Sequence, residues 1–166
     1  RALLEGHHLL AEAGTGTGKT LAYLVPAVLS GQRVIVSTAT RTLQDQLFLK
    51  DIPLLQSAGL KFEAALLKGR SNYLCLQRLD EFERRPLFPT PEDARPWSAF
   101  KEWARATETG DRAEADVPDA WTTWPLLSTT SDNCLGSRCP AFESCFVTRA
   151  RETAAHGVVS VDGLRP

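Results

Sequence analysis

The chain has 166 residues, a formal net charge of −1, 43% hydrophobic residues and 23% charged residues. This near-neutral charge excludes a protein that binds nucleic acid through its overall positive charge, so any contact with DNA has to come from a local groove. No apolar run approaches the ~20 residues of a membrane span, and no signal peptide is recognisable, so we expect a cytoplasmic protein. The sequence contains no methionine, even at position 1, and we therefore expect it to be part of a longer protein.

Residues 11–20 (AEAGTGTGKT) have the pattern of a phosphate-binding loop. An apolar stretch, residues 8–13, predicts a strand that enters the loop, and an amphipathic pattern from residue 19 to about 30 predicts the helix that leaves it. Glycines allow several backbone N–H groups to point at phosphate oxygens, and the helix presents its positive end to the same anion. Lys19 would reach the β- and γ-phosphates, and the Thr20 hydroxyl would hold Mg²⁺.

The predicted nucleotide site therefore extends over eight consecutive residues, with Lys19 and Thr20 in the catalytic roles. Ala13 stands where the usual pattern has its first glycine, a replacement that many helicase-type motors tolerate. The predicted nucleotide-binding residues are Ala13, Gly14, Thr15, Gly16, Thr17, Gly18, Lys19 and Thr20.

The first third of the chain alternates predicted strands and helices. Further strands are predicted at residues 33–38 and 62–67, with a helix at 41–49 between them. This βαβαβ order predicts an α/β fold with an open parallel sheet and helices on both faces.

After Gly69 the pattern changes to short helices, at about residues 74–82 and 97–107, separated by segments rich in proline and charge. A loop-like segment follows, and then a helix at about 146–155 and a strand at 158–161. We interpret residues 70–150 as an insertion, with residues 1–69 before it and residues 151–166 as the return to the sheet. Because this insertion has few apolar stripes, we expect it to depend on bound metal for its folding. The change Cys134→Ser would then unfold mainly residues 70–150.

The four cysteines lie at the two ends of this insertion. Cys75 stands alone, whereas Cys134, Cys139 and Cys145 form a C-x₄-C-x₅-C group. Structural zinc sites typically use two tight C-x₂₋₄-C pairs, and one distant cysteine with a compact trio is closer to the way thiolates hold iron–sulphur clusters. Spacing alone leaves three alternatives open, which are a cluster, a zinc site and unrelated buried thiols.

Taken together, these motifs resemble the iron–sulphur superfamily 2 DNA helicases, the XPD-like group, and within it the bacterial DinG/YoaA type. The resemblance covers about residues 9–155. It is carried by the phosphate loop with the residues that follow it to Leu24, by the runs VSTATRTLQDQL (residues 36–47) and LKGRSNYLC (residues 67–75), and by the cysteine trio.

The resemblance implies a RecA-like first motor domain that binds ATP and Mg²⁺ and is interrupted by the insertion. It implies a [4Fe–4S] cluster held by Cys75, Cys134, Cys139 and Cys145. It also implies that Thr38, Thr40 and Arg41 lie near single-stranded or forked DNA. In the complete bacterial protein, ATP hydrolysis would drive movement along DNA and unwinding in the 5′ to 3′ direction, in DNA repair.

Some parts of the family pattern are missing from this sequence. The acidic DEAH box does not occur, and Asp162, which follows an apolar stretch, lacks the glutamate that the box requires. The second motor domain and the adenine-reading segment are also missing. Because phosphoryl transfer depends on these groups, we expect this chain alone to bind nucleotide weakly and to hydrolyse it hardly at all.

Two other functions remain open from the residues alone. One is a non-catalytic, metal-stapled module that binds single-stranded DNA through the insertion. The other is a phosphate-loop kinase or transferase that carries a zinc lobe.

Overall fold

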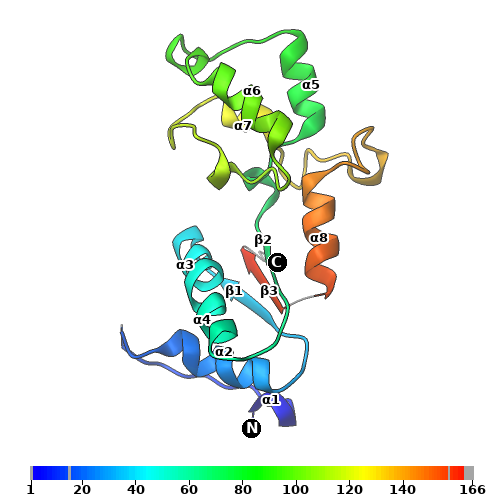
Figure 1. Ribbon diagram of the computed structural model, residues 1–166. Helices are drawn as coiled ribbons and strands as arrows, with labels where there is room; N and C mark the ends of the chain where they lie inside the picture. Colours follow the sequence, from blue (N-terminus) through cyan, green and yellow to red (C-terminus); the bar gives the residue numbers. More distant parts are fainter. Residues whose placement is uncertain (1, 15, 157, 163–166) are drawn as a thin grey trace. The chain divides into compact units, whose positions relative to one another are not determined.

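A computed structural model describes residues 2–14, 16–156 and 158–162 of the chain (Figure 1). The chain divides into two compact units, one made of residues up to Leu67 and from Thr153 onward, and the other of residues from Lys68 to Glu152. We describe each unit by itself as unit 1 and unit 2. The sequence predicts the corresponding boundaries of the insertion after residue 69 and after residue 150.

Unit 1 contains a parallel sheet in which a strand from the end of the chain lies between two strands from its beginning. The strand order is β1-β3-β2, and both pairings are parallel. The helices and strands of this unit are α1 (Ala2–Glu5), α2 (Lys19–Leu29), β1 (Ile35–Thr38), α3 (Arg41–Gln46), a π-helical turn (Leu47–Asp51), α4 (Ile52–Ser57), β2 (Ala64–Leu67) and β3 (Val158–Asp162). These three strands lie in the segments that the sequence predicts as strands, with β3 ending at residue 162 rather than 161.

The two faces of this sheet pack against different helices. On one face, Leu24 of α2 and Ile52 and Leu55 of α4 form a buried cluster to which Ala64 of β2 contributes. The neighbouring residue Ala65 points to the opposite face, where it packs with Ala154 of the last helix. Successive residues of a strand face opposite sides, so β2 is covered on both.

The predicted strand over residues 8–13 is wrong. The structure shows irregular backbone there, with Leu9 77% exposed and Leu10 99% exposed. Its apolar residues suggested a strand, but a strand forms only when its backbone groups pair with a neighbouring strand. Among the described strands, β1, β3 and β2 pair with one another and none pairs with this segment.

The helix predicted at residues 41–49 continues beyond its expected end. After α3 the backbone widens into the π-helical turn and then continues as α4 to Ser57. Pro53 lies at the start of α4. Proline lacks an N–H group and its ring collides with the carbonyl one turn earlier, and the wider turn before Pro53 lets the helical path continue through it.

Unit 2 is helical and irregular, and Figure 1 shows α5, α6 and α7 grouped together. Short 3₁₀ turns occur before and between its helices, at residues 70–72, 92–94, 112–114 and 136–138. The helices are α5 (Leu76–Arg84), α6 (Trp97–Ala106), α7 (Trp124–Leu127) and α8 (Phe146–His156), whose last residues belong to unit 1.

An aromatic core holds unit 2 together, which corrects the expectation that this segment buries little apolar surface. The ring of Phe100 is 1% exposed and lies 5.0 Å from Trp121 and 5.5 Å from Trp97, centroid to centroid. The buried members of this aromatic core are Tyr73, Leu74, Phe82, Phe100, Trp121, Trp124, Leu127, Phe146 and Val147. Aromatic side chains bury large apolar areas, so unit 2 has a source of stability other than bound metal. The sequence pattern did not reveal this core because its residues come from several short helices and loops that are far apart in the sequence.

Asp93 ties two loops of unit 2 to this core. Its carboxylate accepts hydrogen bonds from the hydroxyl and backbone N–H groups of both Thr122 and Thr90. These bonds, that from the Thr122 hydroxyl first, hold the pKa of Asp93 below its usual value. The backbone carbonyl of Asp93 accepts the indole N–H of Trp121 at 2.9 Å.

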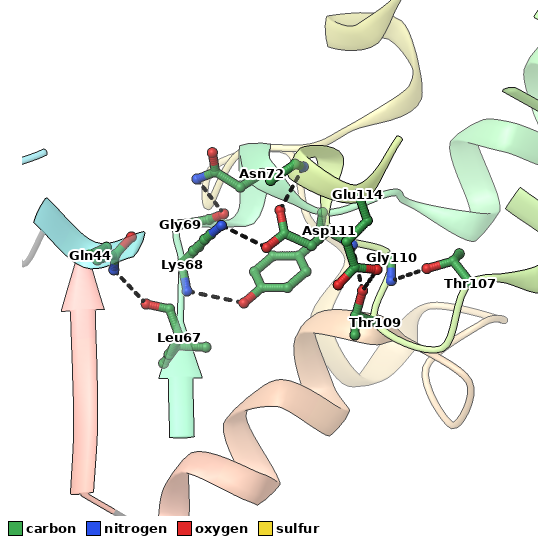
Figure 2. A network of polar contacts seen from close by, with 12 residues as sticks. Gln44, Leu67, Lys68, Gly69, Asn72, Thr107, Thr109, Gly110, Asp111 and Glu114 are labelled. Carbon is green, nitrogen blue, oxygen red and sulfur yellow. Dashed lines mark hydrogen bonds and ion pairs between the residues drawn. The ribbon is translucent and has the colours of Figure 1, made fainter. Parts of the chain in front are cut away.

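A polar network fixes the start of unit 2, as Figure 2 shows. The ammonium of Lys68 lies 2.7 Å from the Asp111 carboxylate, and these side chains are only 3% and 13% exposed. The backbone N–H of Lys68 also donates to the Tyr73 hydroxyl at 3.0 Å. Because removing one partner of a buried ion pair leaves a costly unpaired charge, the network specifies how residues 107–114 pack against residues 68–74.

Gly110, which lies within this network, cannot carry a side chain. Its φ is +66°, and a Cβ atom there would lie 2.3 Å from the ring of Phe146. We expect Gly110→Ala to lower the free energy of unfolding of unit 2 by about 2 to 4 kcal/mol, from left-handed backbone strain and overpacking. Urea unfolding followed by tryptophan fluorescence measures this, since all four tryptophans belong to unit 2.

Gly136→Ala is the matched control for this change. Gly136 also has a positive φ, +58°, but nothing lies within 4 Å of the Cβ position. We expect it to destabilise the unit less than Gly110→Ala, and equal losses would show that contact with Phe146 does not matter.

Candidate functional site

The loop before α2 has the backbone form that an anion site needs. Gly16 and Gly18 have φ values of +77° and +75°, in the left-handed region that glycine adopts readily. Gly18 is the N-cap of α2 and has no side chain with which to cap the first N–H groups of the helix. Those N–H groups and the helix dipole are therefore available to an anion. Thr15 lies outside the described residues.

The Lys19 side chain makes hydrogen bonds to the backbone of this loop. Its ammonium donates to the backbone carbonyls of Ala13 at 2.6 Å and Gly14 at 3.1 Å, and the Thr17 hydroxyl donates to Gly14 at 2.9 Å. An ammonium group has three donor hydrogens, so one remains for a further acceptor. Lys19 is thus placed at the mouth of the loop by contacts that a phosphate would share or replace.

A cavity of about 670 Å³ lies beside this loop in unit 1. Its lining includes Lys19 and Thr20 from α2 and Thr38 from the end of β1, together with Tyr23 and Asp51. The structure therefore brings the predicted Lys19 and Thr20 together with Thr38. Partial burial, helped by the charge of Asp51, raises the pKa of Tyr23 above its usual value, although a hydrogen bond with Thr20 lowers it.

Two buried oxygen atoms at this cavity lack partners. Within the described part of the chain, neither Oγ1 of Thr38 nor Oδ2 of Asp51 has a hydrogen-bond partner. Buried polar atoms are almost always hydrogen-bonded in folded proteins, so this cavity is suited to a polar occupant.

The other two predicted DNA-contacting residues lie at the start of α3. Thr40 is its N-cap, and the Thr40 hydroxyl accepts the N–H of Leu43 at 3.3 Å. Arg41 is the first residue of the helix, and its side chain is outside the described part of the structure. Thr40 thus caps the helix, and this role is independent of any contact with DNA.

A second cavity, in unit 2, gathers all four cysteines. Its volume is about 240 Å³, and Cys75, Cys134, Cys139 and Cys145 all line it. Each is a free thiol and half-buried. One water occupies about 30 Å³ in the liquid, so the cavity has room for a much larger group.

Burial and helix starts act in opposite directions on the charge of these sulphur atoms. Burial raises the pKa of Cys75 above its usual value and outweighs the backbone N–H groups of Arg78 and Gln77, in the first turn of α5, which lower it. Cys145 precedes α8, and its carbonyl accepts the first helical N–H, from Arg149. The positive ends of two helices thus flank the cavity, and such positions stabilise thiolates.

Cys134 and Cys139 have side-chain partners. The guanidinium of Arg70 lies 3.3 Å from the Cys134 sulphur, and the N–H of Gly136 lies 3.4 Å from it. The Cys139 thiol lies 3.2 Å from Oε1 of Gln77. Sequence reasoning missed Arg70 and Gln77, although both lie within five residues of Cys75 in the printed sequence.

The donor set fits an iron–sulphur cluster. Both [2Fe–2S] and [4Fe–4S] clusters are held by four cysteine thiolates and are tuned by hydrogen bonds to their sulphurs. Four free thiols around one cavity, with N–H donors beside them, match that chemistry. Within the described residues, no three His, Cys, Asp or Glu side chains come close enough to hold a single metal ion.

Comparison with known proteins identifies the family. Residues 1–103 match the family described as DEAD/DEAH box helicase. The chain belongs to the DEAD/DEAH box helicase family. Membership implies a RecA-like fold, consistent with the mixed helices and strands of unit 1.

The relatives are helicases of the predicted type. The chain is 43% identical over 164 residues to the ATP-dependent DNA helicase YoaA of Escherichia coli, covering 97% of this chain and 26% of that protein. Identity is 41% to YoaA of Haemophilus influenzae (93% of this chain, 24% of that protein). It is 37% to the ATP-dependent helicase DinG of Mycobacterium tuberculosis (96% and 29%). The predicted resemblance to the DinG/YoaA type is confirmed, and this chain spans about a quarter of the length of these relatives.

The structure also bears on the expectation about membranes. No helix in the described ranges is long and apolar enough to cross a lipid bilayer.

Proposed function

We propose that this chain is part of the first motor of an ATP-dependent DNA helicase, the activity for which its relatives are named. The observation that carries the proposal is the uncapped, glycine-lined start of α2 with Lys19 at its mouth. Nucleotide phosphates would bind along Ala13 to Thr20, with Lys19 facing the β- and γ-phosphates and Thr20 holding Mg²⁺. Mg²⁺ usually keeps several waters and is also held by substrate phosphates, so the Thr20 hydroxyl would be one ligand among these.

We further propose that Cys75, Cys134, Cys139 and Cys145 hold a [4Fe–4S] cluster in unit 2. Bound there, the cluster would supply a rigid cross-link between the segments before α5 and α8 and a centre able to take up one electron. The residues of the chain would orient it, since the starts of α5 and α8 present N–H groups beside it and the Arg70 guanidinium would balance part of the negative charge of the thiolates.

Single-stranded or forked DNA is the proposed partner, with movement in the 5′ to 3′ direction. Support comes from Thr38, which ends β1 on the wall of the cavity that Lys19 and Thr20 also line. Because Thr38 lines the same cavity as the phosphate loop, nucleotide binding could change the position of the Thr38 hydroxyl. If Thr38 also contacts DNA, this would couple the nucleotide site to the DNA site.

A chimera tests the proposed function. Residues 1–166 would replace the matching segment of E. coli YoaA, and DNA-stimulated ATP hydrolysis and strand separation would be measured. We expect both activities in the chimera and only background hydrolysis from residues 1–166 alone, because catalysis also needs groups from outside this sequence. The same chimera with Lys19→Ala is the inactive control. A folded, iron-containing chimera without DNA-stimulated hydrolysis would contradict the proposal.

A further inference from the structure

We propose that Gln77 is a positioning residue for the cluster, whose side-chain amide donates a hydrogen bond to the Cys139 sulphur when that sulphur is bound to iron. This inference rests on the cluster proposed above. It concerns a residue of α5 that lies two positions after Cys75 and lines the same cavity.

The Gln77 amide has two partners in the structure. Its Oε1 lies 3.2 Å from the Cys139 sulphur, which donates as a thiol, and its Nε2 donates to Oε1 of Glu81 at 3.1 Å. A thiolate has no proton and can only accept hydrogen bonds. An amide oxygen facing a thiolate would therefore be repelled by it.

Rotation of the amide about its last torsion resolves this conflict. The rotation exchanges Oε1 and Nε2 with almost no change in shape, so Nε2 then faces the Cys139 sulphur. The amide oxygen then faces the Glu81 carboxylate, but Glu81 lies on the exposed side of α5, where its carboxylate can turn to water and gives up only a weak surface contact. Gln77 thus exchanges a surface contact for one with a cluster ligand.

Two of the other sulphurs already have N–H donors, and the side-chain contact of Gln77 is with Cys139. Cys134 accepts from Arg70 and Gly136, and Cys75 lies at the N–H groups of the first turn of α5. In the described part of the chain, the Gln77 amide is the side-chain amide in hydrogen-bonding range of Cys139. Gln77 would complete the shell of donors on the side of the cavity formed by α5.

Hydrogen bonds to cluster sulphurs stabilise the reduced cluster more than the oxidised one, because reduction adds negative charge. Removing the Gln77 amide should therefore make the cluster harder to reduce. The reduction potential reports this contact, whereas a side chain that only fills space would leave the potential unchanged.

The test uses residues 1–166 loaded with iron and sulphide under anaerobic conditions. Gln77→Leu keeps the size and helix propensity of the side chain but removes the amide, and Gln77→Glu places a carboxylate against the sulphurs. We expect Gln77→Leu to lower the ratio of reduced to oxidised cluster about tenfold at a fixed potential, which is ~59 mV for one electron. Gln77→Glu should shift the ratio further and speed iron release to a chelator severalfold.

Glu81→Ala is the matched control, since it removes the other partner of Gln77 and leaves the amide in place. It should leave the potential unchanged. Tryptophan fluorescence establishes that the aromatic core of each variant is folded, and a folded Gln77→Leu chain that binds no iron would also support the proposal.

Three outcomes would overturn the proposal. An unchanged potential in iron-loaded Gln77→Leu, or an equal shift in Glu81→Ala, overturns the role of Gln77 alone. A wild-type chain that binds no iron overturns the proposed cluster and this inference with it.

Discussion

Changing Cys134 to serine is expected to remove iron from the chain while leaving most of unit 2 folded. A [4Fe–4S] cluster needs four thiolates, and Cys134 is the sulphur that Arg70 and Gly136 contact. The iron content should fall from about four atoms per chain to near zero. The aromatic core should survive, because it includes nine buried residues, none of which is a cysteine.

Hydrogen exchange locates the change within unit 2. We expect lost protection around residues 130–145, next to the cavity, and retained protection in α6, which contributes Phe100 to the core. Ser137→Ala is the control, because Ser137 also lines the cavity but offers no sulphur. Loss of protection throughout unit 2 would instead support the expectation from the sequence that metal alone stabilises the insertion.

Changing Lys19 to alanine is expected to weaken ATP binding by at least about 100-fold, which corresponds to about 2.7 kcal/mol. The change removes the ammonium group at the mouth of the loop and its bonds to Ala13 and Gly14. Titration with a fluorescent ATP analogue in the presence of Mg²⁺ measures the effect.

Lys50→Ala provides the matched control. It removes the same charge from an exposed lysine in the π-helical turn of unit 1, and we expect its affinity for ATP to stay within about twofold of wild type, since exposed charges interact weakly through water. Equal affinities in wild type and Lys19→Ala would rule out the phosphate loop as the nucleotide site.

The local pattern of the sequence predicts well where each element depends on its own residues. The helix after the phosphate loop begins at Lys19, as expected, because a glycine precedes it and its apolar residues recur at helical spacing. The segment at residues 8–13 is apolar too, yet it forms no strand in this structure. A strand requires a partner, and the pattern of one segment carries no information about its partner.

Contacts between residues that are far apart in the sequence could not be predicted from local patterns, and this applies to the surroundings of the cysteines. The compact spacing of Cys134, Cys139 and Cys145 suggested a common site, the family resemblance assigned Cys75 to it as well, and all four line one cavity in the structure. That Gln77 contacts Cys139 across 62 residues follows only from the packing of α5 against the loop before α8. The aromatic core was missed for the same reason, since Phe100 and Trp121 belong to segments with different local patterns.

The position of β3 has a consequence for the order in which the chain can fold during synthesis. Val159 pairs with Ile35 on one side and Ala65 on the other, so the middle of the sheet emerges from the ribosome after everything that flanks it. Until then β1 and β2 have no strand between them, and closing so long a loop slows folding. Unit 2 has a core of its own and emerges earlier, and because domains generally fold as units, it can fold first and hold the ends of the loop closer together. Slow translation through unit 2 would then speed completion of the sheet.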